Sequence, residues 1–438
     1  MRTKPSRTIG ILAGGGNLPL EVAASLKARD NPIKVIAFSN EVSAAIHALD
    51  PTIIHWGQIE KIFQTLKDSN CRSLVIVGTV ARPDLARIKP DIGFLKAIPT
   101  ILKIIAAGGD DAVLRRVVAF FEANGVTIIS PAEAAPELVI AQGPFAGSKA
   151  PVHVARDVAT GFAAIRAMSS FDVGQTVIVS NGKLEAIEGV DGTDAMLERI
   201  AARRAPRAQL ARDTVPLGVL VKRPKPGQEL RVDLPAIGPR TITRSIEANI
   251  SGIAVEAGNV LAVERENLAI NADAHAMFVQ GYTEDDLSRF DVPKSKEPEP
   301  QRIRVLGKVR PNTQARKDAI KGARLLAALE PFDQNMVCIV SRRHVLAVDQ
   351  SQHRAQAIAR AGDFRQWGDK RWQKRLGVVV LPFGRDADED TIQATARAGL
   401  RCIAIRLNKF SASASAPMIA IANRHKIAIV EVFPDAGA

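Results

Sequence analysis

The sequence is short of cysteine, of aromatic residues and of long apolar segments. Its three cysteines, Cys71, Cys338 and Cys402, lie too far apart for a disulfide framework or a zinc-binding spacing. Such sparse cysteine is typical of a reducing compartment, so we expect a cytoplasmic location. No apolar run reaches the ~18 residues that a membrane-spanning helix requires. The seven histidines are scattered, and no two have the spacing of metal ligands on a helix.

Positive charge is in excess, and it is placed unevenly. The formal net charge is +13, and residues 301–438 contain 24 Lys and Arg against 12 Asp and Glu. A basic segment can bind nucleic acid or anionic lipid, or can simply be solvated. No aromatic residues alternate with these basic residues and no zinc finger accompanies them, so we expect no nucleic-acid partner.

Apolar runs alternate with amphipathic helical segments through the first part of the chain. Strand-like runs occupy 8–13, 33–38, 52–55, 73–79 and 126–130. Strands that are apolar throughout are typical of a parallel sheet with helices on both faces. The sequence therefore predicts an α/β fold with a doubly wound sheet in this region.

Glycine, proline and charged segments suggest where the domains end. We expect a first domain at 1–150, ending in a Gly/Pro-rich crossing segment, and a second α/β domain at 151–282. Residues 283–302 are charged, proline-rich and aperiodic, which is typical of a linker. A third α/β domain is predicted at 303–438.

The third domain repeats the second. "FDVGQTVIVSNGKLEAIE" at 171–188 aligns with "FDQNMVCIVSRRHVLAVD" at 332–349, an offset of 161 residues. "GVLV" at 218 and "GVVV" at 377 are 159 apart, whereas "GIAV" at 252 and "CIAI" at 402 are 150 apart. Offsets that change only in loops indicate a duplicated domain, because loops absorb insertions.

Two polar loops of the second domain are degenerate in the third. Most of "KPGQELRVDLPAIG" (225–238) has no counterpart, and "EGVDGTDAML" (188–197) becomes "DQSQHRAQAI", with one acid. The acids at 388–390 suit a helix N-terminus instead. We therefore predict that the third domain is pseudo-catalytic: it stabilises, recruits or regulates, and its deletion leaves the chemistry largely intact.

A glycine-rich turn follows the first predicted strand. Gly14, Gly15 and Gly16 precede a helix, where backbone N–H groups can approach an anionic ligand. The dinucleotide-binding fingerprint requires a further glycine where this chain has Pro19, which disfavours an oxidoreductase. A tight turn without a ligand remains the alternative.

Two further polar groups belong to the same predicted domain. Thr79 and Arg82 follow the fourth strand at its carboxyl end, where doubly wound sheets bind ligands. Asp110 and Asp111 begin an amphipathic helix and are candidates for substrate contact. Helix capping is the alternative for these two acids.

The loop at 188–197 is a candidate for metal binding. Glu188, Asp191 and Asp194 lie in a turn that also contains Gly192 and Thr193. Carboxylates beside other oxygen donors suit Mg²⁺, which takes few protein carboxylates together with substrate phosphate. Alternatively, Thr193 or Asp194 only caps the following helix.

The loop at 225–238 combines cations with an acid. Together with Lys222 just before the loop, Lys225 and Arg231 can neutralise phosphate oxygens, and Asp233 lies beside them in sequence. Cations, Mg²⁺ and a carboxylate that positions or deprotonates water are what cleavage of a phosphoanhydride requires.

Five motifs together resemble one known family. "GILAGGGNLP", "GTVARPD", "GDDAVLRRV", "DGTDAM" and "KPGQELRVDLPAIG" look like the two-domain UDP-2,3-diacylglucosamine pyrophosphatases of lipid A synthesis, which are unrelated to the calcineurin-like enzymes. The resemblance covers residues 8–282. It implies a Rossmann-like N-terminal domain, a smaller α/β catalytic domain, and Mg²⁺-dependent hydrolysis to UMP and 2,3-diacylglucosamine 1-phosphate (lipid X).

The resemblance also implies roles for particular residues. It makes Asp233 the essential acid, with Gln228 in the same motif. From the chemistry of the two loops, Asp233 and Asp194 are the candidate metal ligands. A diacylated UDP-sugar substrate implies transient contact with an anionic membrane surface, at the inner face of the cytoplasmic membrane. Self-association as a homo-oligomer is left open. The alternative is a non-catalytic protein that binds nucleotide sugar or lipid, with a C-terminal interaction module.

Overall fold

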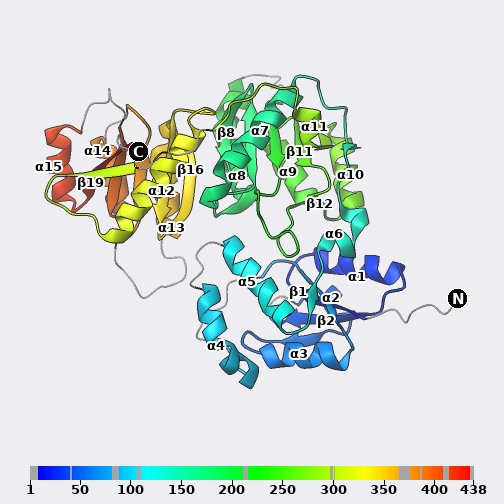
Figure 1. Cartoon of the computed structure of the whole chain (residues 1–438). Helices are drawn as coiled ribbons and strands as arrows, with labels where there is room; N and C mark the ends of the chain where they lie inside the picture. Colours follow the sequence, from blue (N-terminus) through cyan, green and yellow to red (C-terminus); the bar gives the residue numbers. More distant parts are fainter. Residues whose placement is uncertain are drawn as a thin grey trace. The chain divides into compact units, whose positions relative to one another are not determined.

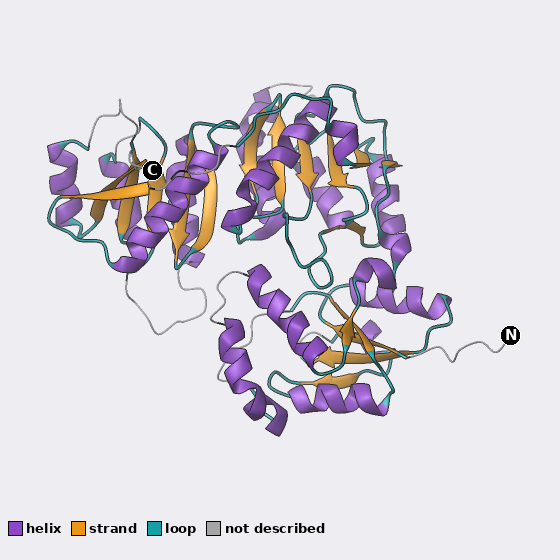
Figure 2. Ribbon diagram, viewed as in Figure 1, coloured by secondary structure: helices purple, strands orange, loops and turns teal. Residues whose placement is uncertain are grey.

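The chain forms two compact units, which are described separately. The computed structural model describes residues 8–39, 42–80, 88–105, 110–210, 216–295, 299, 301–364, 375–384, 387–407 and 414–434. The first unit contains residues 1–147, 227–242 and 255–276, and the second contains 148–226, 243–254 and 277–438. Figures 1 and 2 show their helices and strands.

The first unit contains the predicted doubly wound sheet. Its strand order is β3-β2-β1-β4-β5, and every pairing is parallel. The strands are β1 (Ile9–Ala13), β2 (Ile33–Phe38), β3 (Thr52–Ile54), β4 (Ser73–Val77) and β5 (Thr127–Ile128). The chain order reverses beside β1, as it does in Rossmann-like folds, so the expected fold class is confirmed.

Helices cover both faces of this sheet. They are α1 (Leu18–Ala28), α2 (Ala44–His47), α3 (Ile59–Asp68), α4 (Ile92–Ile105), α5 (Asp110–Ala123) and α6 (Pro131–Ala134), with a 3₁₀ turn at Pro136–Leu138. Helix α10 (Arg265–Ala274) instead contacts β6 (Gly143–Ala146), a strand of another sheet. Ile11 packs with α1 in one apolar cluster, and its neighbour Leu12 packs with α3 in another. Successive strand residues point to opposite faces, so β1 is buried on both sides (Figure 1).

One six-stranded sheet occurs twice, mostly within the second unit, although β6 and the end of β11 fall in residue ranges of the first unit. The first copy has the order β6-β13-β11-β9-β7-β8 and the second has β14-β19-β18-β17-β15-β16. The first copy consists of β6 (Gly143–Ala146), β7 (Thr176–Ser180), β8 (Lys183–Ile187), β9 (Val219–Lys222), β11 (Gly252–Glu256) and β13 (Phe278–Tyr282), with α7 (Val154–Met168), a 3₁₀ turn (Ser169–Phe171), α8 (Gly192–Leu210), α9 (Pro239–Glu247) and α11 (Glu284–Leu287).

The second copy has the same succession of elements. It consists of β14 (Gln301–Leu306), α12 (Thr313–Leu329), β15 (Met336–Ser341), β16 (His344–Gln350), a 3₁₀ turn (Ser351–His353), α13 (Arg354–Phe364), β17 (Val378–Leu381), α14 (Glu389–Arg397), β18 (Cys402–Arg406), α15 (Ala416–Arg424) and β19 (Ala428–Pro434). In each copy the second and third strands along the chain form an antiparallel hairpin. The predicted duplication is therefore confirmed.

A buried aspartate closes the hairpin in both copies. The Asp157 carboxylate accepts both backbone N–H groups of the turn at 181–182, at 3.0 and 2.6 Å. The Asp318 carboxylate accepts those of the turn at 342–343, at 3.0 and 2.8 Å. All four turn residues have positive φ, which a two-residue type I′ hairpin requires. The duplication thus extends to individual hydrogen bonds.

The two copies share one hydrophobic core. Phe162 and Phe171 of the first copy belong to the same buried cluster as Leu326 and Phe332 of the second. Removing the second copy would expose this surface to water at a cost of roughly 25 cal/mol per Å². The expectation that deletion of residues 303–438 leaves the chemistry largely intact stays a prediction, and the loss of this shared core argues against it.

Part of the segment expected to be a linker is ordered. Helix α11 begins with a capping box between Thr283 and Asp286, and Phe290 and Val292 pack against the shared core. The three cysteines are buried and unpaired, as their spacing predicts. Within the described ranges, no helix combines the length and apolarity needed to cross a bilayer.

The first unit also takes in two later segments of the chain. Strand β10 (Ala236–Ile237) pairs in parallel with β12 (Leu261–Ala262), and Leu261 packs in the same cluster as Ile11. The Ile140 N–H donates to the Val260 carbonyl at 3.0 Å. These contacts fix the end of the 225–238 loop on the first unit.

Candidate active site

Asp233 is held in a defined orientation. Gln228 Nε2 donates to Asp233 Oδ2 and to the Asp233 carbonyl, both at 2.7 Å. The Asp233 N–H donates to the Glu229 carbonyl at 3.0 Å, which closes one helical turn. Gln228 is only 8% exposed, so its amide is itself fixed by packing. The acid expected to be essential is therefore oriented by a neutral donor.

The residues on either side of Asp233 anchor the loop to the sheet of the first unit. Val232 packs against the cluster that contains Leu12, and Leu234 packs against the cluster that contains Ile11. The Pro235 carbonyl accepts the Leu261 N–H at 2.9 Å. Because the two clusters lie on opposite faces of the sheet, Asp233 lies between two fixed points.

Arg231 is paired with two carboxylates. Its guanidinium donates to Glu229 through two nitrogens, each at 2.7 Å, and to Glu122 of α5 at 2.6 Å. The hydrogen bond to Glu229 is the main reason that the pKa of Arg231 is raised, and it lowers the pKa of Glu229. The expected phosphate contact of Arg231 stays a prediction, and it requires a phosphate to compete with these carboxylates.

The glycine turn joins two loops of the first unit. The N–H groups of Gly14 and Gly15 donate to the carbonyls of Val77 and Thr79, at 2.8 and 2.6 Å. A Cβ on Gly14 would lie 2.3 Å from the Thr79 carbonyl oxygen, so only glycine permits this approach. Two of the three amides predicted to face an anion are thus already hydrogen-bonded, and Gly16 N–H is the remaining candidate.

Two acids that the sequence does not reveal as partners lie beside this turn. Asn17 Nδ2 donates to Glu264 Oε1 at 2.9 Å, and the Glu264 N–H donates to Glu21 Oε1 at 2.7 Å. Burial, and then the nearby Glu264 carboxylate, raises the pKa of Glu21. Nothing in the sequence brings residues 21 and 264 together, because they meet only through tertiary packing.

The structure places only some of the other residues of the first unit that were predicted to contact substrate. Thr79 lies beside the glycine turn, and its N–H donates to the Gly15 carbonyl at 2.9 Å. Arg82 lies outside the described residues. Asp110 and Asp111 begin α5 as predicted, and Arg115, one turn later, donates to the Gly227 carbonyl at 3.4 Å. Helix α5 therefore borders the loop that carries Asp233.

A buried polar network occupies one end of the first sheet in the second unit. Thr193 Oγ1 donates to Glu188 Oε1 at 2.5 Å and accepts from Lys222 Nζ at 3.1 Å. Glu188 is 8% exposed and Lys222 6% exposed. Thr176 pairs directly with Lys222 across β7 and β9, which brings the three chain segments together. Thr193 and Lys222, predicted separately, thus belong to one network.

Glu188 is the member of this network whose role the sequence does not reveal. The sequence indicates only a carboxylate turn, but the Gln175 N–H and the Thr193 hydroxyl both donate to Glu188. Gly174 permits this arrangement, since a Cβ there would lie 2.5 Å from the Glu188 carbonyl oxygen. The Thr193 hydroxyl thus links a buried glutamate to a buried lysine, and the two charged side chains are held in fixed positions.

The expected metal ligands belong to no group of three or more potential ligands within the described part of the chain. Gly192 has φ +84° and begins α8, and Asp194 lies in the first turn of that helix. Among the residues that the structure describes, no three His, Cys, Asp or Glu side chains form a metal-binding group. Mg²⁺ commonly uses one or two carboxylates with water and substrate phosphates, so Asp233 or Asp194 each fits as a partial ligand.

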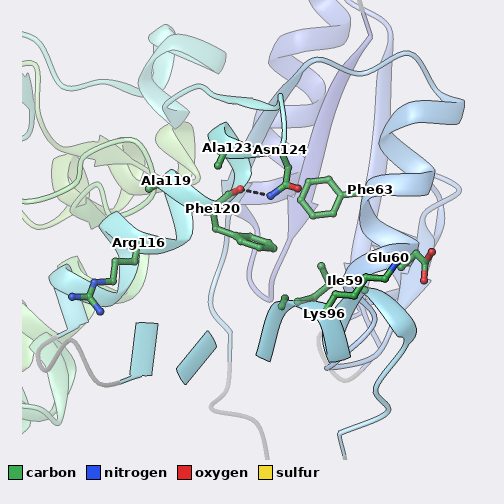
Figure 3. Close-up of a pocket in the computed structure, with 11 residues that line it drawn as sticks. Ile59, Glu60, Phe63, Lys96, Arg116, Ala119, Phe120, Ala123 and Asn124 are labelled. Atoms are coloured by element: carbon green, nitrogen blue, oxygen red, sulfur yellow. Dashed lines mark hydrogen bonds between the residues drawn. The ribbon is translucent and has the colours of Figure 1, made fainter. Parts of the chain in front are cut away.

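The first unit also has an apolar groove between α3, α4 and α5. It has a volume of about 760 Å³ and is lined by Phe63, Ala97 and Phe120, with Lys96 and Arg116 among its polar members. Figure 3 shows Phe63 and Phe120 on facing elements, with the Asn124 amide donating to the Phe120 carbonyl. Such a groove suits an apolar ligand with negative charge nearby.

A doubly wound unit, a smaller α/β domain, an oriented aspartate and a buried lysine network describe a recognisable class of protein. The LpxI N-terminal domain matches residues 8–138, and the LpxI C-terminal domain matches 141–280 and again 303–430. The chain therefore belongs to the LpxI family, and the duplication is a repeat of that family's C-terminal domain.

One curated relative is the UDP-2,3-diacylglucosamine pyrophosphatase LpxI of Caulobacter vibrioides. It is 38% identical over 276 residues, which are 63% of this chain and 97% of the relative. The family inferred from the five motifs is confirmed. Because 276 residues nearly fill the relative, it has no room for a second copy of the C-terminal domain.

Proposed function

We propose that this protein hydrolyses the pyrophosphate bond of UDP-2,3-diacylglucosamine in lipid A synthesis, releasing UMP and 2,3-diacylglucosamine 1-phosphate. The observation that carries the proposal is the 38% identity to an LpxI pyrophosphatase over 97% of that relative's length. The oriented carboxylate of Asp233 supports it, because it lies in the motif that distinguishes the second domain from its degenerate copy.

The side chains of this chain suit separate roles in that reaction. Asp233, oriented by Gln228, positions the attacking water and accepts its proton. Lys222, hydrogen-bonded to Thr193, offers a fixed positive charge to phosphate oxygens. Glu188 offsets the charge of Lys222 through Thr193, which lowers the free-energy cost of keeping that lysine buried.

We further propose that the reaction depends on Mg²⁺. Asp233 and Asp194 are the residues that would hold it, each as a partial ligand. When bound, Mg²⁺ offsets charge on the phosphate oxygens. Two cations of the 225–238 loop already pair with carboxylates of the protein: Arg231 with Glu229 and Glu122, and Lys225 with Asp172 at 2.6 Å. Their charge is therefore partly offset before substrate binds, which favours a metal ion as a further source of positive charge.

We propose that the protein acts at the inner face of the cytoplasmic membrane, and that α4 makes the contact. Ile92 and Leu95 on α4 are 62% and 56% exposed, and Ile98 continues the same face. Lys96 lies on the same helix and Lys89 just before it. Apolar side chains with flanking lysines suit an anionic bilayer surface. This proposal puts the contact on the first unit, although most of the excess positive charge lies in residues 301–438.

The deciding experiment is an assay of the full-length protein with UDP-2,3-diacylglucosamine and Mg²⁺, scored for UMP. Release of UMP together with lipid X in equal amounts is the expected result. Tight binding of the substrate without any UMP would favour the alternative, a non-catalytic protein that binds nucleotide sugar or lipid.

A further inference from the structure

The two copies of the C-terminal domain pack through equivalent elements. Edge strand β8 of the first copy contacts edge strand β16 of the second, and α7 contacts α12. These pairs occupy the same places in their respective sheets. An interface in which both partners use the same surface is called isologous and is typical of symmetric dimers. Here such an interface forms between two domains of one chain.

Five charged side chains meet at this interface. Asp191 lies just before α8, and Arg199 and Arg203 lie on that helix. Arg360 Nε lies 3.6 Å from Asp191 Oδ2, and Arg360 Nη2 lies 3.3 Å from Asp349 Oδ2. Asp349 also accepts from Arg203 Nη2 at 2.7 Å, and Asp191 accepts from Arg199. Arg360 therefore connects the two aspartates.

The same interface fixes the loop before α8. Val190 packs against the apolar cluster of the second copy, which contains Leu346 and Ile358. A Cβ on Gly189 would lie 3.4 Å from the Leu346 carbonyl oxygen, so the backbone of the two copies is close here. The side chains of Asp191 and Asp349 are only 8% and 4% exposed. The segment at 188–199, which carries Thr193, is thus held by the degenerate copy.

The interface residues are counterparts of residues in the active copy. At the offset of 161 residues, Asp349 corresponds to Glu188 and Arg360 to Arg199. Glu188 accepts from Thr193, but the residue that corresponds to Thr193 is Arg354, whose Nε donates to Thr391 at 2.8 Å and whose Nη2 pairs with Asp388. Without a threonine partner, the Asp349 carboxylate pairs instead with Arg203 of the active copy and with Arg360 of its own copy.

We propose that Arg360 and Asp349 of the degenerate copy position the 188–199 segment, and with it Thr193, for the reaction. Arg360 is a positioning residue, because it touches Asp191 and not the Glu188–Thr193–Lys222 network itself. The inference rests on the proposed function. The third domain then has a definite role: it holds the 188–199 segment of the active copy, although its own counterpart of that segment is degenerate.

A comparison of substitutions in the full-length protein tests this role. R360M keeps most of the side-chain volume and removes the charge that links Asp191 to Asp349. We expect kcat/KM for UMP release to fall roughly 10- to 100-fold, because small displacements of a positioning group have large effects on rate. R360K retains a charge and should recover part of the loss, which a merely structural role would not predict.

The matched control is R354M, which removes an arginine of the same helix whose ion pair stays within the degenerate copy. It should leave kcat/KM within about two-fold of wild type. Amide hydrogen exchange over 188–199 gives a second readout: faster exchange is expected in R360M and unchanged exchange in R354M. If R360M does not fold, D349N tests the same link from the other side.

The outcomes distinguish the positioning role from the proposed function. Equal kcat/KM and equal exchange over 188–199 in R360M and R354M would overturn the positioning role. Absence of UMP release from the wild-type protein would contradict the proposed function, and the exchange comparison would then decide the positioning role alone.

Discussion

Gln228 donates one amide hydrogen bond to the side chain of Asp233 and another to its backbone carbonyl, both at 2.7 Å. The donor is buried, so it holds the carboxylate in one orientation. A carboxylate held in this way can position a water molecule and accept its proton. This relationship makes Asp233 the first target for substitution.

D233N should abolish hydrolysis while leaving substrate binding intact, because it preserves the shape of the side chain and removes the proton acceptor. We expect a loss of more than a thousand-fold in kcat, about 4 kcal/mol of barrier. Rapid-quench measurement of UMP release gives the rate, and calorimetry gives binding. A variant that kept a tenth of the wild-type rate would show that Asp233 is not the essential acid.

T193V should lower both activity and stability. The substitution removes the hydroxyl that links Glu188 to Lys222 and leaves two charged side chains buried without it. We expect the free energy of unfolding to fall by about 1–3 kcal/mol. Denaturant unfolding measures this, and T193S, which keeps the hydroxyl, is the control. Equal stability and activity of T193V and T193S would refute a functional network here.

Removal of divalent metal should stop turnover, and addition of Mg²⁺ should restore it. Because Mg²⁺ commonly uses few protein carboxylates together with substrate phosphates, binding of Mg²⁺ without substrate should be weak. Activity assays in EDTA test the first statement, and calorimetry of the substrate-free protein with MgCl₂ tests the second. Full activity in EDTA would exclude the proposed dependence on metal.

Glu21 should make stability depend on pH. Burial raises its folded-state pKa above the ordinary value of 4.5, so the folded protein retains a proton that the unfolded chain has lost. The stability contributed by this proton is present below pH 4.5 and is lost as the pH rises through the folded pKa. E21Q lacks this loss, so its melting temperature should rise above that of wild type as pH increases. Parallel curves for the two proteins would contradict the assignment.

Helix α4 should be needed for membrane contact. L95E puts a charge on the exposed apolar face of α4 and should weaken flotation with vesicles that contain anionic phospholipid. I270E is the matched control, because Ile270 is 66% exposed on α10 and lies outside this face. High salt should also weaken binding. If I270E weakened flotation as much as L95E, the contact would not be specific to α4.

Local patterns in the sequence predict much of the fold. The all-apolar runs indicate the parallel sheet, and the offsets between the repeats identify the equivalent strands. Asp388 caps α14 as its place before the helix suggests, with its carboxylate accepting the Thr391 N–H at 2.9 Å. Each of these features depends on residues that are close in sequence or repeated at a fixed interval, which is what periodicity can detect.

The site is harder to predict because it depends on long-range contacts. The link from Lys222 through Thr193 to Glu188 exists because β7 pairs with β9 on one side and β8 on the other. Strand pairing of this kind does not follow from the order of residues. Similarly, the motif at 225–238 indicates Asp233, but not that the first unit contains residues 227–242. The hydrogen bond from Gln228 to Asp233, in contrast, could be predicted from the sequence, because only five positions separate the two residues.

The buried aspartates that close the two hairpins affect how the sequence of the degenerate copy can diverge. The turn at 181–182 is Asn-Gly, which favours positive φ, whereas the turn at 342–343 is Arg-Arg. Left-handed backbone costs a residue such as arginine roughly 1–2 kcal/mol, yet both turns keep the same shape. Asp318 explains this, because it accepts both backbone amides whatever side chains follow them. A carboxylate in this position relieves selection on the turn itself, so the turn sequence can change while the hairpin keeps its geometry.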